Sequence, residues 1–578
     1  MNDPAAVGPL RPAARARSVP GQAGRRFFRI CRPARPEVWL VAGAFLLSLL
    51  LKASMLGAGA PQVEIDDFVL YEGGFVAWFG HAPQQHGYLE VWLVGLTSLA
   101  TYCARMIGAG QMGELTDVNL VANAYRDFIQ SPAGYYHTHR AVILLLDLLT
   151  AGVVFLLARR VLGRTRGRLG PALVAVMYLF SYNTFWCLLR ARPDPLVSLA
   201  AAGGVLLYLK SEARFDGPSF WLAGVCLGLA AGLKLHGACF TLFIALDIVR
   251  RRGWREGLGG AALLSAIALS FFFVGDGVLL FDPILYVKGR LLTYYADLSP
   301  HIPWGRHLVV MLRGSGWIVL PFMIAGTVMV YRRWRREAKD GQEDLRSVAL
   351  IGVAWLLLCA AVRPLRAYWM LPVLPLIYIV AVHGLSRLRP VVRGTALAAI
   401  ALIFGAQSMA EVRLAHTADL DELRQWIVNN IPRESSFYIL GDSVARLPQN
   451  TEAMHALRAV YEEVGERDRE AGMSFTERHA KHWEESTHLR LFDMLDYRSP
   501  GYYYFFYDQL PFDRFPQAAP LDSFEFIVVQ ERYARAADPQ VRELLAGRYV
   551  KVAEARSEGM QGRGLLHEVY RRGDGVAR

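Results

Sequence analysis

Residues 38–57 read VWLVAGAFLLSLLLKASMLG, and Lys52 is the only charged residue among them. A bilayer core about 30 Å thick is crossed by about 20 helical residues, so this stretch is long enough to span it. No small-residue cleavage site follows, and further apolar stretches come later, which excludes a removable signal peptide. The chain of 578 residues is 53% hydrophobic, too apolar for a soluble protein of this size. We therefore predict a polytopic α-helical membrane protein.

The basic loops predict the direction of the chain, because short loops rich in Lys and Arg stay in the cytoplasm. Residues 1–36 hold eight arginines and one acid, and four later loops are also basic. Residues 58–138, in contrast, carry eight acids and two arginines and should lie outside. The four basic loops are 158–168, 250–255, 331–339 and 387–393.

Eleven transmembrane helices agree with this charge pattern, which puts the N-terminus inside and the C-terminal part outside. Residues 88–108 are also apolar enough to cross. Crossing there would move the basic loop 158–168 outside, so we expect a helix on or in the outer leaflet. The expected spans are 38–57, 140–158, 171–189, 195–209, 218–233, 235–249, 257–275, 307–330, 347–362, 367–386 and 393–410.

The chain divides into three parts by composition. Residues 1–36 form a basic cytoplasmic arm, 37–411 a transmembrane domain with a first external loop at 58–139, and 412–578 a small extracytoplasmic α/β domain. The last part has a net charge of −5, against +17 for the rest. Because the positive charge belongs to loops that flank membrane spans, we expect membrane lipids and no nucleic acid as partners. Strands are expected at 436–442, 524–530 and 549–554.

Two adjacent aspartates, Asp66 and Asp67, open the first external loop. On a helix, neighbouring side chains point about 100° apart, so only one of them can face a given substrate atom. Asp67 shares a helix face with Tyr71, and Asp66 shares one with Leu70. Either carboxylate could accept the proton of a hydroxyl, and the choice between them stays open. A helix N-cap with a solvated neighbour is the structural alternative.

Cationic residues at the predicted outer ends of the spans suggest an anionic substrate. An arginine fork suits a phosphate, and its charge does not titrate away. Arg192 and Arg366 lie where the topology does not call for positive charge, so they are more informative than the cytoplasmic arginines. The ionisable residues at these outer ends are Arg190, Arg192, Lys234, His236, Arg363 and Arg366, together with the acid Asp194. No CxxC motif or histidine-rich cluster indicates a metal site.

Several motifs, taken in order, resemble the C-type membrane glycosyltransferases that use polyprenyl-phosphate sugars. The nearest branch is that of the protein O-mannosyltransferases and aminoarabinose (lipid A) transferases, similar to glycosyltransferase family 39. In that branch an Asp-Glu or Asp-Asp pair opens the first external loop. Here the second acid is Asp rather than Glu, and His86-Gly87 stands where that branch has a Pro-Pro turn. The motifs are IDDFVLYEGGFVAWFGHAPQQHGYLEVWLVGL (65–96), HTHRAVILLLDLLTAGVVFLLARRVLG (137–163), LLRARPDPLVSLAAAGGVLLYLK (188–210), GLAAGLKLHG (228–237) and RAYWMLPVLPLIYIV (366–380).

The resemblance implies an inverting transfer of a sugar from a polyprenyl-phosphate donor to a hydroxyl of an extracytoplasmic acceptor, which is a glycan, a lipid or a protein. Asp66 or Asp67 would be the base, and Asp194 a second acid that orients the acceptor. The residues that would bind phosphate or substrate are Arg192, Lys234, His236, Arg363, Arg366, Arg140, Tyr71 and His86. No cofactor is expected, and the need for a divalent cation is left open.

Two other functions compete with this one. A transporter or flippase of lipid-linked sugars should place ionisable residues near the bilayer centre and often has inverted repeats. Here such residues gather at the outer ends of the spans, and no repeat is visible. An inactive membrane scaffold is the other alternative. In each case the expected location is the inner or plasma membrane.

Overall fold

The computed structural model describes most of the helical part and the strands of the C-terminal part. The described residues are 36–57, 71, 74–75, 77–78, 88–117, 119–163, 169–276, 309, 312–314, 316–336, 343–362, 367–417, 420–440, 447, 449–470, 501–506, 523–530, 539–558 and 564–573. Asp66, Asp67, His86, Arg363 and Arg366, which the sequence singles out, lie outside these residues.

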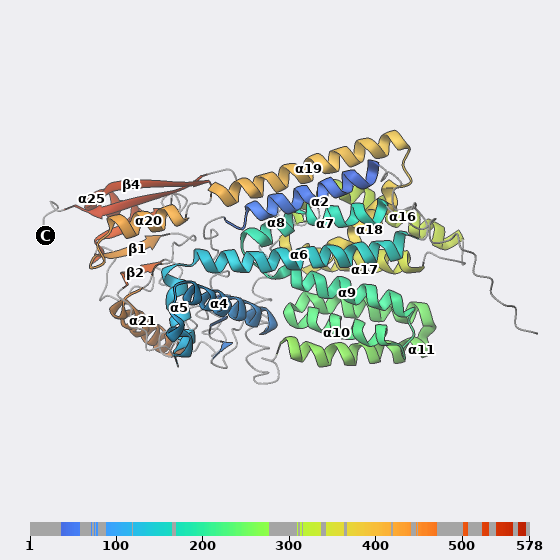
Figure 1. Ribbon diagram of the computed structural model, residues 1–578, viewed down its shortest axis with the longest axis horizontal. Helices are drawn as coiled ribbons and strands as arrows, with labels where there is room; N and C mark the ends of the chain where they lie inside the picture. The colour runs from blue at the N-terminus through green and yellow to red at the C-terminus, as the bar shows by residue number, and fades with distance from the viewer. Residues whose placement is uncertain are drawn as a thin grey trace, which may run out of the picture.

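Long helices packed side by side make up most of the molecule (Figure 1). They are α2 (Pro36–Ser54), α4 (Tyr88–Gly108), α5 (Leu120–Gln130), α6 (Ala133–Leu162), α7 (Leu169–Leu179), α8 (Tyr182–Leu189), α9 (Asp194–Ser211), α10 (Pro218–Leu233), α11 (Ala238–Gly275), α16 (Leu320–Arg336), α17 (Glu343–Val362), α18 (Leu374–Leu385) and α19 (Pro390–Thr417). Short 3₁₀ turns lie at Met112–Thr116, Leu235–Gly237, Trp317–Val319 and Ala367–Met370.

Most predicted membrane spans overlap these helices, but 171–189 covers two of them, α7 and α8, and 367–386 holds a 3₁₀ turn before α18. Five described helical stretches are long and apolar enough to cross a bilayer: Leu89–Gly108, Ala133–Leu162, Leu169–Leu189, Leu235–Gly275 and Pro390–Arg413. Shorter apolar helices, including α10 and α18, accompany them. The polytopic helical fold is confirmed, whereas the count of eleven spans and the direction of the chain stay predictions.

Two predicted spans, 235–249 and 257–275, are joined in α11. Gly253 interrupts this helix with φ 77° and ψ 172°, a conformation that costs a glycine little and an L-residue much. It lies in the basic segment 250–255, which the sequence predicts as a loop. The two halves of α11 are therefore separate helices that meet at this turn.

Helix α4 is the segment for which the charge rule and the hydropathy disagree. It lies beside α5 at the end of the bundle nearest the sheet (Figure 1). Its Thr97 hydroxyl contacts His139 Nδ1 of α6 at 3.0 Å, and its first turn approaches the end of α10. Whether α4 crosses the bilayer stays a prediction.

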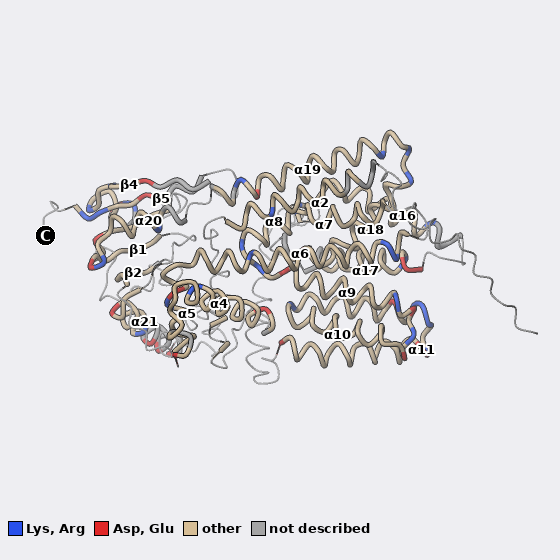
Figure 2. The backbone as a smooth tube through the Cα atoms, in the orientation of Figure 1, with Lys and Arg blue, Asp and Glu red and all other residues tan. Residues whose placement is uncertain are grey.

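The other end of the bundle carries the basic segments 250–255 and 387–393 and the described part of 158–168 (Figure 2). Arg160 at the end of α6 lies 2.8 Å from Asp344 of α17, and Arg251 lies 3.4 Å from the same carboxylate. The fully buried Asp247 accepts hydrogen bonds from Arg251 (3.0 Å) and from the Tyr208 hydroxyl (2.7 Å). Ion pairs thus tie α6, α11 and α17 together at this end, and the Tyr208 hydrogen bond adds α9.

A five-stranded mixed sheet follows α19. Its strand order is β2-β1-β3-β5-β4, parallel across β2, β1 and β3 and antiparallel across β3, β5 and β4. Alternate residues of β1 and β3 pack into two apolar clusters, one on each face of the sheet, as inner strands require, and the buried Gln530 is the polar exception at the end of β3. The elements are β1 (Ser436–Leu440), β2 (Tyr503–Phe506), β3 (Phe526–Gln530), β4 (Tyr549–Glu558) and β5 (Gly564–Arg572), with α20 (Leu420–Asn430), α21 (Thr451–Glu470) and α25 (Pro539–Arg548).

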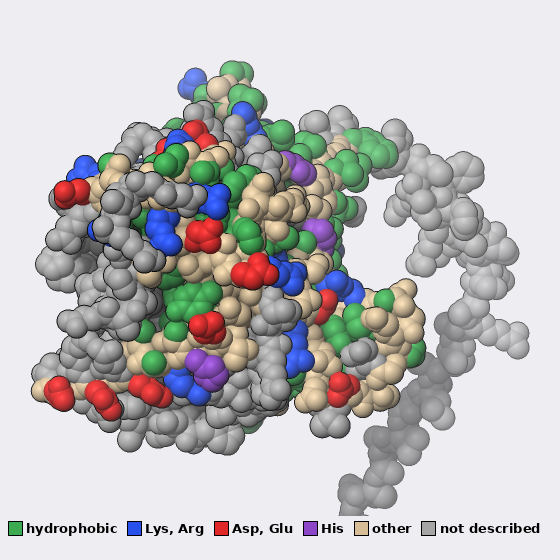
Figure 3. All heavy atoms as spheres, turned by 90° about the vertical axis from the view of Figure 1, so that its left-hand side faces the viewer, with side chains coloured by type: hydrophobic (Ala, Val, Ile, Leu, Met, Phe, Trp, Pro, Cys, Tyr) green, Lys and Arg blue, Asp and Glu red, His purple; other side chains and the backbone are tan. Residues whose placement is uncertain are grey.

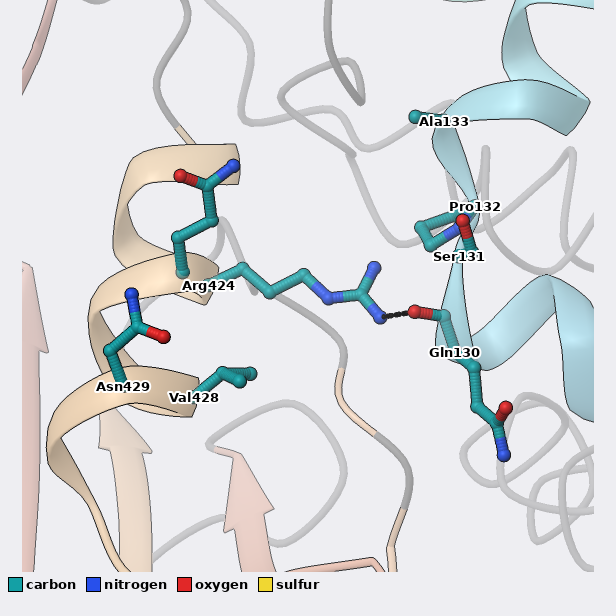
Figure 4. Close-up of a pocket in the computed structure, with 8 residues that line it drawn as sticks. Gln130, Ser131, Pro132, Ala133, Arg424, Val428 and Asn429 are labelled. Carbon is teal, nitrogen blue, oxygen red and sulfur yellow. Dashed lines mark hydrogen bonds between the residues drawn. The ribbon is translucent and has the colours of Figure 1, made fainter.

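One arginine fastens this sheet domain to the helical part. Arg424 of α20 donates hydrogen bonds to the carbonyl oxygens of Ile129 (2.6 Å) and Gln130 (2.7 Å), at the C-terminal end of α5. Figure 4 shows the guanidinium reaching across a cavity of about 230 Å³ toward Gln130. Since the last carbonyls of a helix lack intrahelical partners, a cation there satisfies them and complements the helix dipole.

Candidate active site at the sheet end of the helices

The turn between α8 and α9 places two arginines around one tryptophan. The Arg192 amide donates to the Cys187 carbonyl oxygen at 2.9 Å, and Ala191 takes a left-handed conformation with φ 53°. A non-glycine residue there costs about 1–2 kcal/mol. The guanidinium carbons of Arg190 and Arg192 lie 4.6 and 5.6 Å from the ring centroid of Trp186. Both arginines are buried, so the turn concentrates positive charge in an enclosed place.

A cluster of two carboxylates and one ammonium adjoins this turn. Lys234, just after α10, forms an ion pair with Asp194 in the first turn of α9. Its Nζ also lies 3.9 Å from Glu90 Oε1 in the first turn of α4. Glu90 and Asp194 are each 3% exposed. Asp194 Oδ2 is enclosed and has no hydrogen-bond partner among the described residues. Lys234 therefore lies between two buried carboxylates that come from different helices.

Two histidines flank the cluster. His236 stacks on Trp369 with ring centroids 5.7 Å apart and 19° between the planes. His139 is buried on α6, and its charge interactions include Glu90. Tyr71 lies 5.5 Å from the His139 ring and packs against Phe128 at 5.4 Å. The predicted residue Tyr71 therefore belongs to an aromatic layer next to the cluster.

Arg140, predicted as a phosphate ligand, holds the end of α8. Its Nε and Nη2 atoms donate to the Leu189 carbonyl oxygen at 3.2 and 3.0 Å, and the side chain is fully buried. Leu189 is the last residue of α8 and directly precedes Arg190. Arg140 thus supports the turn that carries the other two arginines.

The structure brings together Arg192, Asp194, Lys234 and His236 from separate predicted loops. Sequence reasoning missed Glu90 and His139. A lone acid at the start of the apolar stretch 88–108 was the available signal for Glu90. His139 had none, because it stands among polar residues at the start of α6. Among the described residues, no three His, Cys, Asp or Glu side chains form a group that could hold a metal ion.

The surface at this end carries both signs of charge. Figure 3 looks onto the face that includes the C-terminal part, where Lys and Arg side chains alternate with Asp and Glu.

Comparisons with known proteins agree with the class indicated by the motifs. Residues 131–361 match the model of Glycosyltransferase family 87, a range that includes Arg192, Asp194, Lys234 and His236. No match is found among curated proteins. The match and the polytopic helical fold confirm a C-type membrane glycosyltransferase, and they support this class rather than its narrower family 39-like branch.

Solved structures match this chain at low sequence identity. ArnT from Cupriavidus metallidurans in the apo state has 14% identity and a TM-score of 0.44, over 93% of this chain and 98% of that one. The same protein bound to undecaprenyl phosphate has 14% identity and a TM-score of 0.44, over 94% and 100%. The oligosaccharyltransferase AglB from Archaeoglobus fulgidus, in complex with an inhibitory peptide and a dolichol-phosphate, has 10% identity and a TM-score of 0.43, over 94% and 75%.

Proposed function

We propose that this protein transfers a sugar from a polyprenyl-phosphate donor to a hydroxyl of an extracytoplasmic acceptor, with inversion at the anomeric carbon. The observation that carries the proposal is the buried Glu90–Lys234–Asp194 cluster beside Arg192. It places carboxylates, which can accept hydrogen bonds from hydroxyl groups, beside a guanidinium group that suits a phosphate. The family match supports a glycosyltransferase, and the motifs support the lipid-linked donor.

The reaction needs one proton transfer and one displacement. The acceptor oxygen attacks the anomeric carbon while Asp66 or Asp67 takes its proton. The bond from that carbon to the phosphate oxygen breaks, and polyprenyl phosphate leaves with the bonding electrons. Arg192, Arg363 and Arg366 stabilise the charge on the leaving phosphate, and His236 lines its path. Asp194, held by Lys234, orients the acceptor.

The orienting role of Asp194 follows from its surroundings. An ammonium on one side fixes the carboxylate, and the enclosed Oδ2 atom is left to accept a hydrogen bond from a ligand. Because charged hydrogen bonds in enclosed sites are strong, a hydroxyl bound there is held in one direction. That arrangement favours attack over loss of the sugar to water.

Reconstituted protein tests the proposal directly. Proteoliposomes given labelled polyprenyl-phosphate sugar and a membrane extract should release polyprenyl phosphate and form a labelled acceptor. Changing both Asp66 and Asp67 to Asn should lower the rate by about 10²–10⁴-fold, the range for a general base. Asp117→Asn is the matched control, because this acid of the same loop is exposed and bonded to Asn119.

Each outcome has a distinct meaning. Unchanged transfer by the double variant would remove the base assignment. Movement of the labelled lipid across the bilayer without a labelled acceptor would instead identify a flippase. No transfer and no movement by the wild-type protein would favour the scaffold.

A further inference from the structure

His139 is a buried histidine of which one ring nitrogen is bonded and the other is not. Helix α4 packs against the start of α6, and the ring lies in the contact between the two helices (Figure 1). The residue is 1% exposed, and its Nδ1 atom lies 3.0 Å from Thr97 Oγ1. Its Nε2 atom is enclosed and makes no hydrogen bond within the part of the chain that the structure describes. Because buried polar atoms nearly always have a partner, this nitrogen needs an explanation.

The other partners of Thr97 decide which nitrogen carries the ring proton. Its Oγ1 atom lies 2.9 Å from the carbonyl oxygens of both Leu93 and Val94, which can only accept hydrogen bonds. The single hydroxyl hydrogen is therefore directed to the carbonyl side, and a lone pair of Oγ1 faces the histidine. Nδ1 must then be the donor in the contact with His139, so the proton is on Nδ1 and Nε2 carries a lone pair.

A lone pair at Nε2 selects the chemical class of the ligand. An unprotonated ring nitrogen binds a group that donates a hydrogen bond. A phosphate dianion has no hydrogen to donate, and neither does a hydrocarbon tail. Hydroxyl groups do, and both the sugar of the donor and the acceptor in the proposed reaction carry them. The free nitrogen of His139 therefore suits a hydroxyl of one of these two substrates.

The surroundings of His139 belong to the candidate site. The ring meets Tyr71 edge to face at 5.5 Å, and Tyr71 stands four residues after Asp67, one of the two proposed bases. Arg140, the next residue of α6, supports the turn that carries the arginines. On α4, Glu90 lies two helical turns before the threonine that contacts the ring, and on the same face of the helix. The histidine is thus placed between the elements that carry the predicted chemistry.

We propose that His139 is a substrate-binding residue whose Nε2 atom accepts a hydrogen bond from a hydroxyl of the donor sugar or of the acceptor. Thr97 is the positioning residue that keeps the proton on Nδ1 and so leaves the lone pair on Nε2. This inference rests on the proposed function and adds His139 and Thr97 to its site. His139 orients the hydroxyl and takes no proton from it.

Two amide substitutions separate the roles of the two ring nitrogens. The side-chain nitrogen of asparagine takes the place of Nδ1, whereas the longer glutamine reaches the place of Nε2. His139→Asn keeps the contact with Thr97 and removes the acceptor, so kcat/KM for sugar transfer by the full-length protein should fall about tenfold or more. His139→Gln keeps an acceptor at the free position and should lose less than about threefold.

Thr97 provides a second test with a matched control on the same helix. Thr97→Val removes the acceptor for the Nδ1 proton and should lower kcat/KM about three- to tenfold, whereas Thr97→Ser should restore it. Thr101→Val makes the same change one turn later, where the hydroxyl of the 6% exposed Thr101 donates to the Thr97 carbonyl oxygen at 2.8 Å. It should leave transfer unchanged.

Binding measurements in nanodiscs distinguish the two sources of the hydroxyl. The probes are sugar-free undecaprenyl phosphate and undecaprenyl phosphate that carries mannose, glucose, galactose or arabinose. If His139→Asn weakens binding of a sugar-bearing lipid only, the hydroxyl belongs to the donor sugar. If donor binding is unchanged and the KM for the acceptor in the membrane extract rises, the hydroxyl belongs to the acceptor. Weaker binding of the sugar-free lipid would show that the ring binds phosphate and would overturn the inference.

Stability measurements separate binding from packing. A purely structural role would lower the unfolding temperatures of His139→Asn and His139→Gln alike and give them equal rates, which would overturn the inference. If His139→Asn does not fold, the comparison of Thr97→Val with Thr101→Val decides, and equal rates in those two variants would reject it. Normal transfer by all variants would leave the proposed function standing without this inference. Absence of transfer by the wild-type protein would reject the proposed function itself, and the inference with it.

Discussion

A buried ion pair between α2 and α6 gives a quantitative test of the packing. Lys52 Nζ lies 2.7 Å from Asp147 Oδ2, and both side chains have no exposed surface. The ammonium also lies 5.1 Å from the Phe185 ring centroid, and Asp147 Oδ1 has no hydrogen-bond partner among the described residues. Neither charge can therefore reach water when its partner is removed.

The magnitude follows from the distance. Coulomb's law gives an attraction of about 6 kcal/mol at 2.7 Å with an effective dielectric constant of about 20. Desolvation of the two ions offsets much of it, so the pair adds little net stability. Removing one partner leaves an unpaired buried charge, and Lys52→Met should lower the free energy of unfolding by about 3–5 kcal/mol. The double variant Lys52→Met with Asp147→Leu should lie within about 1–2 kcal/mol of wild type.

Equilibrium unfolding in mixed micelles, followed by tryptophan fluorescence, measures these differences. The coupling energy of the double-mutant cycle should be several kcal/mol. A double variant that loses as much stability as the two single variants added together would refute the reasoning. So would a Lys52→Met variant that unfolds like wild type.

Two further predictions concern helix packing and the attachment of the sheet. A Cβ on Gly384 would lie 2.3 Å from the Phe322 carbonyl oxygen, so Gly384→Ala should cost about 1–3 kcal/mol in the same unfolding assay. Gly405→Ala on α19, with no atom within 4 Å, should be neutral or stabilising, and equal losses in both would contradict the close approach. Arg424→Ala removes two charged hydrogen bonds and should lower the free energy of opening α20 by about 1.5–3 kcal/mol. Hydrogen exchange should then be faster in α20 and unchanged in α6. Unchanged exchange in α20 would show that other contacts hold the sheet domain.

Hydropathy and charge predicted most of the helical fold. Apolar stretches near 20 residues become helices because a backbone in lipid must satisfy its own hydrogen bonds. The basic loop 250–255 marked the turn that Gly253 makes inside α11. Helix ends were less well predicted: the span expected at 171–189 is two helices, α7 and α8, since the chain bends near Ser181.

The candidate site was predicted in part. Arg192, Asp194, Lys234 and His236 were recognised because charged groups at the ends of apolar stretches are uncommon. Glu90 was not, because a single charge near the end of a long apolar helix resembles an ordinary flanking residue. Lys52 looked like such a flank, yet it is paired inside the bundle.

The sequence alone therefore determined the class of the protein: a polytopic helical chain with a basic and an acidic part and ionisable residues near the ends of its spans. Only the tertiary structure decided which of those residues meet. Glu90 lies in α4, Asp194 in α9 and Lys234 just after α10, and the Lys234 ammonium lies near both carboxylates. The reason is physical: hydropathy acts along the chain and fixes each helix separately, whereas the pairing of buried charges depends on how the helices pack against one another.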